Sequence, residues 1–142
     1  YIEIGGEVFA SGNKADKSPW KVGIYDPSES SDSNIFGIVE MNNNALATSG
    51  DYLQYFKKDG KKYSHIIDPR TGYPVTHQVV SVSVLAKHCA LADALSTAVL
   101  VMGVQEGLAL LNSLPHVDGL IIERLSDGVI RTHRTPNFIL KD

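Results

Sequence analysis

The sequence lacks the patterns that mark several large classes of protein. It contains one cysteine, Cys89, among 142 residues, so no disulfide can form within the chain. No apolar run reaches the roughly 20 residues of a membrane-spanning helix, since Asp93, Ser96 and Thr97 interrupt the longest candidate. The net charge of −3 at pH 7 provides no broad basic field, and we therefore expect no nucleic-acid partner.

Motifs for zinc and for the common nucleotide-binding folds are also absent. The histidines His77, His88, His116 and His133 have no ligand-like spacing. Neither Gly-x-x-x-x-Gly-Lys-Ser/Thr nor Gly-x-Gly-x-x-Gly occurs. Cys89 stands at the edge of an apolar stretch, which is more typical of a small core residue than of a nucleophile.

The hydrophobic pattern that is present predicts the fold class. We expect strands at residues 2–10 (interrupted by two glycines), 20–25, 35–41, 45–49, 63–67, 79–86, 119–124, 128–132 and 138–140. Two apolar segments, 89–102 and 105–113, predict adjacent helices that end at Gly103 and before Pro115. Residues 26–34 predict an exposed loop, and the lysine-rich residues 57–62 a solvated turn. The order predicts a single α+β domain over residues 1–142, a mostly antiparallel sheet with two adjacent helices packed on one face.

Asp93 and Thr97 form the first candidate site. They are four residues apart on the predicted helix 89–102, and they therefore share one of its faces. The helix is otherwise nearly all apolar, which predicts a buried helix where a carboxylate needs a partner or a cation. Oxygen ligands suit Mg²⁺ or Ca²⁺ and not zinc. The alternative is a carboxylate favoured by the helix dipole, with the Thr97 hydroxyl bonded back to a carbonyl.

His65 and the turn that follows it form the second candidate site. A histidine beside a turn that contains Asp68 and Arg70 can act as the general base for a hydroxyl nucleophile. Arg70 can reach a phosphate or pair with Asp68. The alternative is an ordinary corner, in which Asp68-Pro69 sets the turn and Gly72 supplies a positive φ.

Two small-residue segments, Gly5-Gly6-Glu7 and Thr48-Ser49-Gly50-Asp51, form a third set of candidates. Their backbone N–H groups and hydroxyls can face a phosphate, since glycine lets a ligand approach closely. The alternative is that both are simply tight turns.

Taken in order, these segments resemble the ApbE family. The resemblance rests on Gly5-Gly6-Glu7, Trp20-Lys21-Val22-Gly23-Ile24, Ala47-Thr48-Ser49-Gly50-Asp51, His65-Ile66-Ile67-Asp68-Pro69-Arg70-Thr71-Gly72 and Ala92-Asp93-Ala94-Leu95-Ser96-Thr97-Ala98. It covers nearly all 142 residues and implies an ApbE-like, T-fold-related architecture. Family members are more than twice as long, so we expect this chain to be the C-terminal portion, without the N-terminal half.

The resemblance implies a Mg²⁺-dependent FAD:protein FMN transferase. Such an enzyme moves FMN from FAD to a Thr or Ser hydroxyl of a target protein and releases AMP. The implied acceptors are subunits of electron-transfer complexes or sodium pumps. The implied location is the periplasmic face of the cytoplasmic membrane, after export as a lipoprotein whose anchor lies in the N-terminal part. The alternatives are an FAD pyrophosphatase that yields FMN and AMP, a non-catalytic flavin-binding protein, and an α+β interaction module.

The resemblance also implies roles for individual residues. Asp93 and Thr97 fall on metal-ligand positions, and His65 falls on the position of the base that deprotonates the acceptor. Ile67 falls on the wall of the FAD site. Cofactor contacts are also expected from the segment around Ile67 and from the two turns, at Gly5, Gly6, Glu7, Thr48, Ser49 and Asp68. Alone, we expect these 142 residues to bind FAD weakly, to transfer no FMN and to self-associate through an exposed strand edge.

Overall fold

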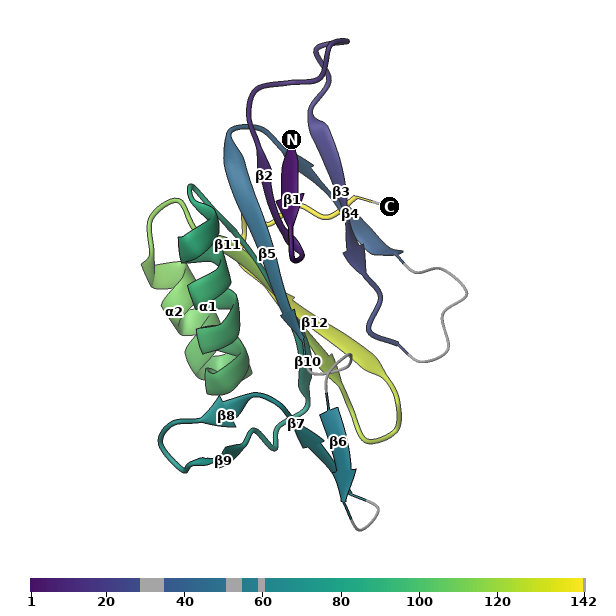
Figure 1. The fold of residues 1–142 in the computed structure, drawn as a ribbon, viewed down its shortest axis with the longest axis vertical. Coiled ribbons are helices and arrows are strands. Elements are labelled where there is room, and N and C mark those ends of the chain that lie inside the picture. The colour runs from purple at the N-terminus through teal and green to yellow at the C-terminus, as the bar shows by residue number, and fades with distance from the viewer. Residues whose placement is uncertain (29–34, 51–54, 59–60, 142) are drawn as a thin grey trace.

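The computed structural model describes residues 1–28, 35–50, 55–58 and 61–141 (Figure 1). Its main sheet has six strands in the order β1-β2-β5-β10-β11-β12, and every neighbouring pair is antiparallel. The strands are β1 (Ile2–Ile4), β2 (Glu7–Ala10), β5 (Asn44–Gly50), β10 (Val79–Ala86), β11 (Asp118–Arg124) and β12 (Ile130–Arg134). The predicted α+β class with a mostly antiparallel sheet is confirmed.

Two helices, α1 (Cys89–Met102) and α2 (Val104–Ser113), cover one face of this sheet, as predicted. Gly103 separates them with a φ of 81°, and its N–H donates to the carbonyl of Val99. Only residues without a Cβ adopt this backbone freely, which explains why the first helix ends there. The core under the helices contains Val82, Val84, Val99, Leu100, Leu111 and Ile121. None of the described helices is long and apolar enough to cross a membrane.

The opposite face of the sheet is covered by a second, two-stranded antiparallel sheet, β3 (Trp20–Tyr25) and β4 (Ile35–Met41). Its inward side chains alternate along each strand, and they build a second core with the main sheet. That core contains Ile24, Val39, Met41, Leu120, Ile122 and Phe138. The central strand β10 is therefore buried on both faces.

Two small hairpins lie at one end of the main sheet: β6 (Tyr55–Lys58) with β7 (Lys61–Ser64), and β8 (Ile67–Asp68) with β9 (Tyr73–Pro74) (Figure 1). The predicted strand 63–67 is wrong, because it breaks at His65. The Ser64 hydroxyl accepts the N–H of Ile66 at 3.1 Å, which bends the chain there. The predicted lysine turn is also wrong in part, since four of its residues lie in strands β6 and β7.

The remaining corrections concern two loops and the end of the chain. Of the predicted loop 26–34, only residues 26–28 are described, and Pro27 is buried with its carbonyl accepting a hydrogen bond from Arg124. Strand β12 begins two residues later than predicted, because the turn closes only where the Leu125 N–H donates to the Val129 carbonyl. Residues 138–140 form no strand.

Candidate functional site

Two of the predicted site residues lie on helix α1, and the hairpin that follows His65 lies beside the end of this helix. Asp93 lies in its N-terminal half and Thr97 one turn later. A cavity of about 460 Å³ is lined by residues of the β8–β9 hairpin and by the last residues of the helix, Val101 and Met102. At 1.5 Å per residue, Asp93 and Val101 are separated by about 12 Å along the axis.

An open groove of about 310 Å³ brings the carboxylates of Glu7 and Asp93 to one place. Glu7 begins β2 directly after the β1–β2 turn, where Gly5 and Gly6 have φ values of 67° and 103°. These positive values confirm a tight turn that disfavours other residues. The other lining side chains are mainly apolar: Ile2, Ile4, Phe9, Cys89 and Ala90. The groove thus combines an apolar wall with two carboxylates from separate elements.

Helix α1 is not the buried helix that the sequence predicts. One face is buried through Ala92, Ser96, Val99 and Leu100, whereas Asp93 is exposed. Burial therefore gives no reason for Asp93 to require a cation. Within the described part of the chain, its carboxylate makes no hydrogen bond or ion pair, so its oxygens are open to a ligand.

Thr97 is joined to the sheet through hydroxyl groups. Its Oγ1 lies 2.9 Å from Ser49 Oγ, which in turn lies 2.8 Å from Ser96 Oγ. Ser96 Oγ donates to the backbone carbonyl of Asp93 at 2.9 Å. The alternative in which Thr97 bonds back to a carbonyl is wrong for the described structure, because the Thr97 hydroxyl contacts β5 instead.

The side chains of Thr48 and Ser49 point to opposite faces of the main sheet, and neither residue lies in a turn. Both belong to strand β5, which continues to Gly50. Successive strand residues point to opposite faces, so Ser49 faces α1 while Thr48 contacts Ser83 Oγ at 2.8 Å on the other side. The Thr48 side chain thus lies on the face of the sheet opposite α1, and its contact with the cofactor stays a prediction. Asp51 lies outside the described residues.

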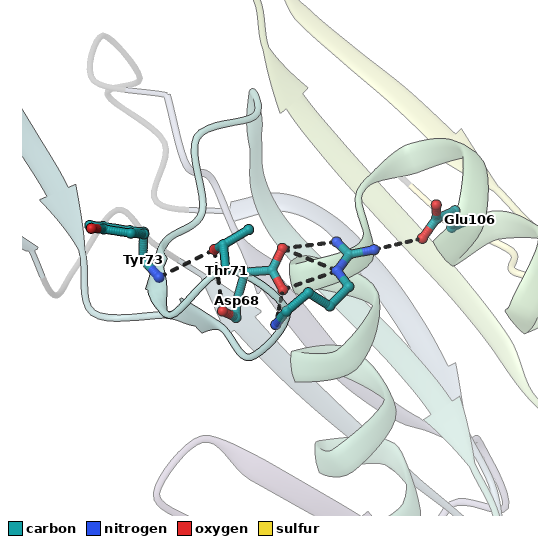
Figure 2. A network of polar contacts seen from close by, with 5 residues as sticks. Asp68, Thr71, Tyr73 and Glu106 are labelled. Atoms are coloured by element: carbon teal, nitrogen blue, oxygen red, sulfur yellow. Dashed lines mark hydrogen bonds and ion pairs between the residues drawn. The ribbon is translucent and has the colours of Figure 1, made fainter.

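Figure 2 shows the polar network of the β8–β9 turn. The guanidinium of Arg70 contacts both carboxylate oxygens of Asp68, with Nη2 at 2.9 Å from Oδ2 and Nε at 3.0 Å from Oδ1. Its Nη1 reaches Glu106 Oε2 on α2 at 3.3 Å. Hydrogen bonding to Arg70 is the main reason that the pKa of the Asp68 carboxyl is lowered. Of the two possibilities for Arg70, the structure shows the pair with Asp68, and contact with a phosphate stays a prediction.

His65 and Ile67 flank the start of this hairpin. His65 is exposed in the bend between β7 and β8. Ile67 opens β8 opposite Pro74, and 49% of it is exposed. An exposed apolar side chain next to an exposed imidazole suits contact with a flat ring and with a protein hydroxyl. Their assignments as flavin wall and base stay predictions.

The donor set on α1 fits a hard cation. Asp93 offers a carboxylate and Thr97 a hydroxyl, and Mg²⁺ is typically held by one or two carboxylates together with substrate phosphates and water. Among the described residues, no three His, Cys, Asp or Glu side chains form a cluster that would hold a metal by itself. The side chains on this helix therefore provide two oxygen ligands, and water or a phosphate-bearing substrate would supply the others.

Two residues with polar contacts at the candidate site were not singled out from the sequence. Ser96 lies on the buried face of α1 with no exposed surface, and its part in the hydroxyl network depends on Ser49 being opposite it. Glu106 meets Arg70 across 36 residues of sequence. Neither contact has a local sequence signal, because each joins elements that only the tertiary fold brings together.

Comparisons with known proteins agree with this arrangement. The model of the ApbE family matches residues 1–121. The chain is 45% identical to an FAD:protein FMN transferase of Vibrio cholerae serotype O1 over 127 residues, which cover 89% of this chain and 37% of that protein. It is 40% identical to an FAD:protein FMN transferase of Treponema pallidum, covering 91% of this chain and 39% of that protein.

Solved structures show the same similarity. The flavin transferase ApbE from Vibrio cholerae superposes with a TM-score of 0.80 at 40% identity, over 96% of this chain and 42% of that one. The flavinyl transferase ApbE of Pseudomonas stutzeri, in its apo form, gives a TM-score of 0.77 at 39% identity, over 96% and 41%. The chain thus spans about two fifths of the length of these relatives.

Proposed function

Because the chain belongs to the ApbE family, we propose that the protein is a Mg²⁺-dependent FAD:protein FMN transferase. The observation that carries the proposal is the exposed carboxylate of Asp93, which makes no hydrogen bond or ion pair with any described residue and lies on the helix face that also bears Thr97. An open apolar groove beside Asp93, and the exposed pair His65 and Ile67, support the same reaction.

The proposed reaction transfers a phosphoryl-linked group between two oxygens. The acceptor hydroxyl oxygen attacks the phosphorus of the FMN half of FAD, the pyrophosphate P–O bond breaks, and AMP leaves. The hydroxyl proton passes to His65, whose ring nitrogen serves as the base. The products are AMP and a protein with FMN joined through a phosphate ester to Thr or Ser.

The oxygen ligands on α1 would hold the cation that neutralises the negative charge of the pyrophosphate. Asp93 and Thr97 would hold a Mg²⁺ ion, which supplies positive charge to neutralise phosphate oxygens during transfer. Glu7, which follows the Gly5-Gly6 turn, lines the groove beside Asp93, and Ile67 would pack against the isoalloxazine ring.

The proposal extends to the partner and the compartment. The acceptor is a protein with a Thr or Ser hydroxyl, of the class found in electron-transfer complexes or sodium pumps. We place the enzyme at the periplasmic face of the cytoplasmic membrane, held by a lipid anchor.

AMP release from FAD tests the proposal. The protein, in the longest form that its gene encodes, is incubated with FAD and Mg²⁺, with and without a flavin-acceptor domain, and a parallel series contains EDTA. We expect AMP to appear only with Mg²⁺ and to increase with the acceptor. Equal release of AMP and free FMN without an acceptor would favour the pyrophosphatase. FAD binding without AMP would favour a non-catalytic flavin-binding protein.

A further inference from the structure

Three hydroxyl groups connect helix α1 to strand β5, and one of them is that of the predicted cation ligand Thr97. They belong to Thr97, Ser49 and Ser96. We propose that Ser49 is a positioning residue for the cation site, because it fixes the direction in which the Thr97 hydroxyl points its proton. This inference rests on the proposed function, which makes Thr97 an oxygen ligand of Mg²⁺.

The direction of the network is set at the Ser96 end. Ser96 Oγ lies 2.9 Å from the backbone carbonyl oxygen of Asp93. A carbonyl oxygen can only accept a hydrogen bond, so Ser96 must donate here. A serine hydroxyl has a single hydrogen, which means that Ser96 is the acceptor in its other contact, 2.8 Å from Ser49 Oγ.

The same reasoning passes along the network to Thr97. Ser49 uses its hydrogen to donate to Ser96, so it must accept in its 2.9 Å contact with Thr97 Oγ1. The order is therefore Thr97 to Ser49, Ser49 to Ser96, and Ser96 to the carbonyl of Asp93. Ser96 has no exposed surface, so water does not compete with Ser49 at that hydroxyl.

This order prepares Thr97 to bind a cation. Its hydrogen is directed toward Ser49 and the sheet, which leaves the oxygen lone pairs for other partners. A hydroxyl that donates a hydrogen bond also becomes a better electron donor, since neighbouring hydrogen bonds polarise one another. Partners of metal ligands act in this way in many metal sites, by fixing the orientation and the basicity of the ligand.

The network also joins the two predicted ligands. It begins at the side chain of Thr97 and ends on the backbone of Asp93, four residues earlier on the same helix. A change at Ser49 would thus alter the hydroxyl ligand directly, while the carboxylate of Asp93 keeps its exposed position. The expected result is weaker cation binding without loss of the carboxylate.

Strand β5 supplies a matched control at the preceding position. Thr48 makes the same kind of contact, 2.8 Å from Ser83 Oγ, but on the opposite face of the sheet. Replacing Thr48 removes a comparable hydroxyl pair from the same strand without touching Thr97. A general loss of sheet stability would appear in both variants, whereas a positioning effect would appear in the Ser49 variant alone.

Cation affinity in the absence of FAD and acceptor is the measurement that tests the inference. In the longest form of the protein that the gene encodes, Mg²⁺ binding is measured by calorimetry and Mn²⁺ binding by electron paramagnetic resonance. For Ser49→Ala we expect a dissociation constant about 10 to 100 times higher, the range typical for partners of metal ligands. Thr48→Ala and Ser49→Thr, which keeps the hydroxyl, should bind as the unchanged protein does.

Ser96→Ala tests the direction of the protons. It leaves the contact of Ser49 with Thr97 in place but frees the Ser49 hydrogen to turn toward Thr97, so we expect a smaller loss of affinity. Thermal midpoints in EDTA report folding for each variant. Unchanged affinity in Ser49→Ala, an equal loss in Thr48→Ala, or no cation binding by the unchanged protein would overturn the inference. Intact cation binding without FMN transfer would count against the proposed function alone.

Discussion

Arg70 and Asp68 form a two-oxygen ion pair within one turn, with Nη2 2.9 Å from Oδ2 and Nε 3.0 Å from Oδ1. The Arg70 N–H also donates to Asp68 Oδ1 at 2.9 Å. Only 14% of the Asp68 side chain is exposed, although 57% of the Arg70 side chain is. The turn that follows His65 and Ile67 is therefore held by a carboxylate that is already engaged within the chain.

The first prediction concerns Asp68→Asn and pH. The folded-state pKa of Asp68 is lowered, so its contribution to stability is fully present above the unfolded pKa of about 3.9. That contribution is lost as the pH falls through the lower folded-state pKa. We expect Asp68→Asn to lower the thermal midpoint at pH 7 and to approach the unchanged protein in strong acid.

Asp127→Asn is the control for that series. The Asp127 carboxylate also accepts a backbone N–H in a turn, from Val129 at 3.0 Å, but it has no arginine partner in the described structure. Circular dichroism melts from pH 7 downward provide the comparison. A midpoint difference for Asp68→Asn that stays constant with pH would contradict the account of the ion pair.

The second prediction concerns the contact between the two helices. A Cβ added to Gly107 would lie 2.6 Å from Val99 Cγ1 and 3.3 Å from the Val99 carbonyl oxygen. We expect Gly107→Ala to destabilise the fold by about 1–3 kcal/mol through overpacking, despite its better helix propensity. Urea denaturation measures this change. Gln105→Ala, at an exposed position of α2, should change stability little, and a stabilised Gly107→Ala would refute the close packing.

The third prediction concerns the C-terminal segment. Phe138 is 1% exposed in the second core, while the next residue, Ile139, is 64% exposed. We expect Phe138→Ala to cost about 3–5 kcal/mol, as for other buried aromatic residues, and Ile139→Ala to be nearly neutral. Equal effects in denaturant melts would show that the segment is not anchored by Phe138.

The fourth prediction concerns the cation. Mg²⁺ should raise the thermal midpoint of the protein, because a ligand that binds the folded state stabilises it by mass action. Asp93→Asn should abolish this rise and leave the metal-free midpoint almost unchanged, since the side chain is exposed. Differential scanning calorimetry with Mg²⁺ and with EDTA measures both values. Glu106→Gln is the control and should keep the rise in thermal midpoint caused by Mg²⁺. If Asp93→Asn kept the full rise, or if Glu106→Gln lost it, Asp93 would not be the cation ligand.

The sequence predicted those parts of the fold that depend on local pattern. Both helices and the strands at 20–25, 35–41 and 79–86 agree with the structure within a residue. Gly103 ends α1 through a backbone requirement that is visible in the sequence. Periodicity and special backbone positions are local properties, and the residues themselves therefore specify them.

Tertiary contacts explain the predictions that were wrong. Residues 138–140 are apolar enough for a strand, but Phe138 packs into the core and its N–H donates to the Thr135 carbonyl. Among the described residues, the segment pairs with β4 through the bridge between Lys141 and Ile38. The alternative that Thr48 and Ser49 lie in a tight turn was wrong, because both belong to strand β5, which directs their side chains to opposite faces.

The prediction that α1 is a buried helix was also wrong. A nearly continuous apolar sequence predicts burial on all sides, but the structure leaves both Leu91 and Asp93 exposed. Composition alone does not record which neighbours cover a helix. The resemblance of the motifs, rather than the burial argument, correctly pointed to the family.

We propose above all that His65 is the base in a metal-dependent transfer of FMN to a protein hydroxyl. Its most direct test is intact mass spectrometry of a flavin-acceptor domain after incubation with FAD, Mg²⁺ and the enzyme in the longest form that its gene encodes. The comparison includes His65→Ala, Asp93→Ala and, as a control, His133→Ala, whose ring pairs with Glu123 at 2.7 Å. We predict that the acceptor gains the mass of FMN with the unchanged enzyme and with His133→Ala, and gains none with the other two. Full FMN addition by His65→Ala or Asp93→Ala would contradict the account.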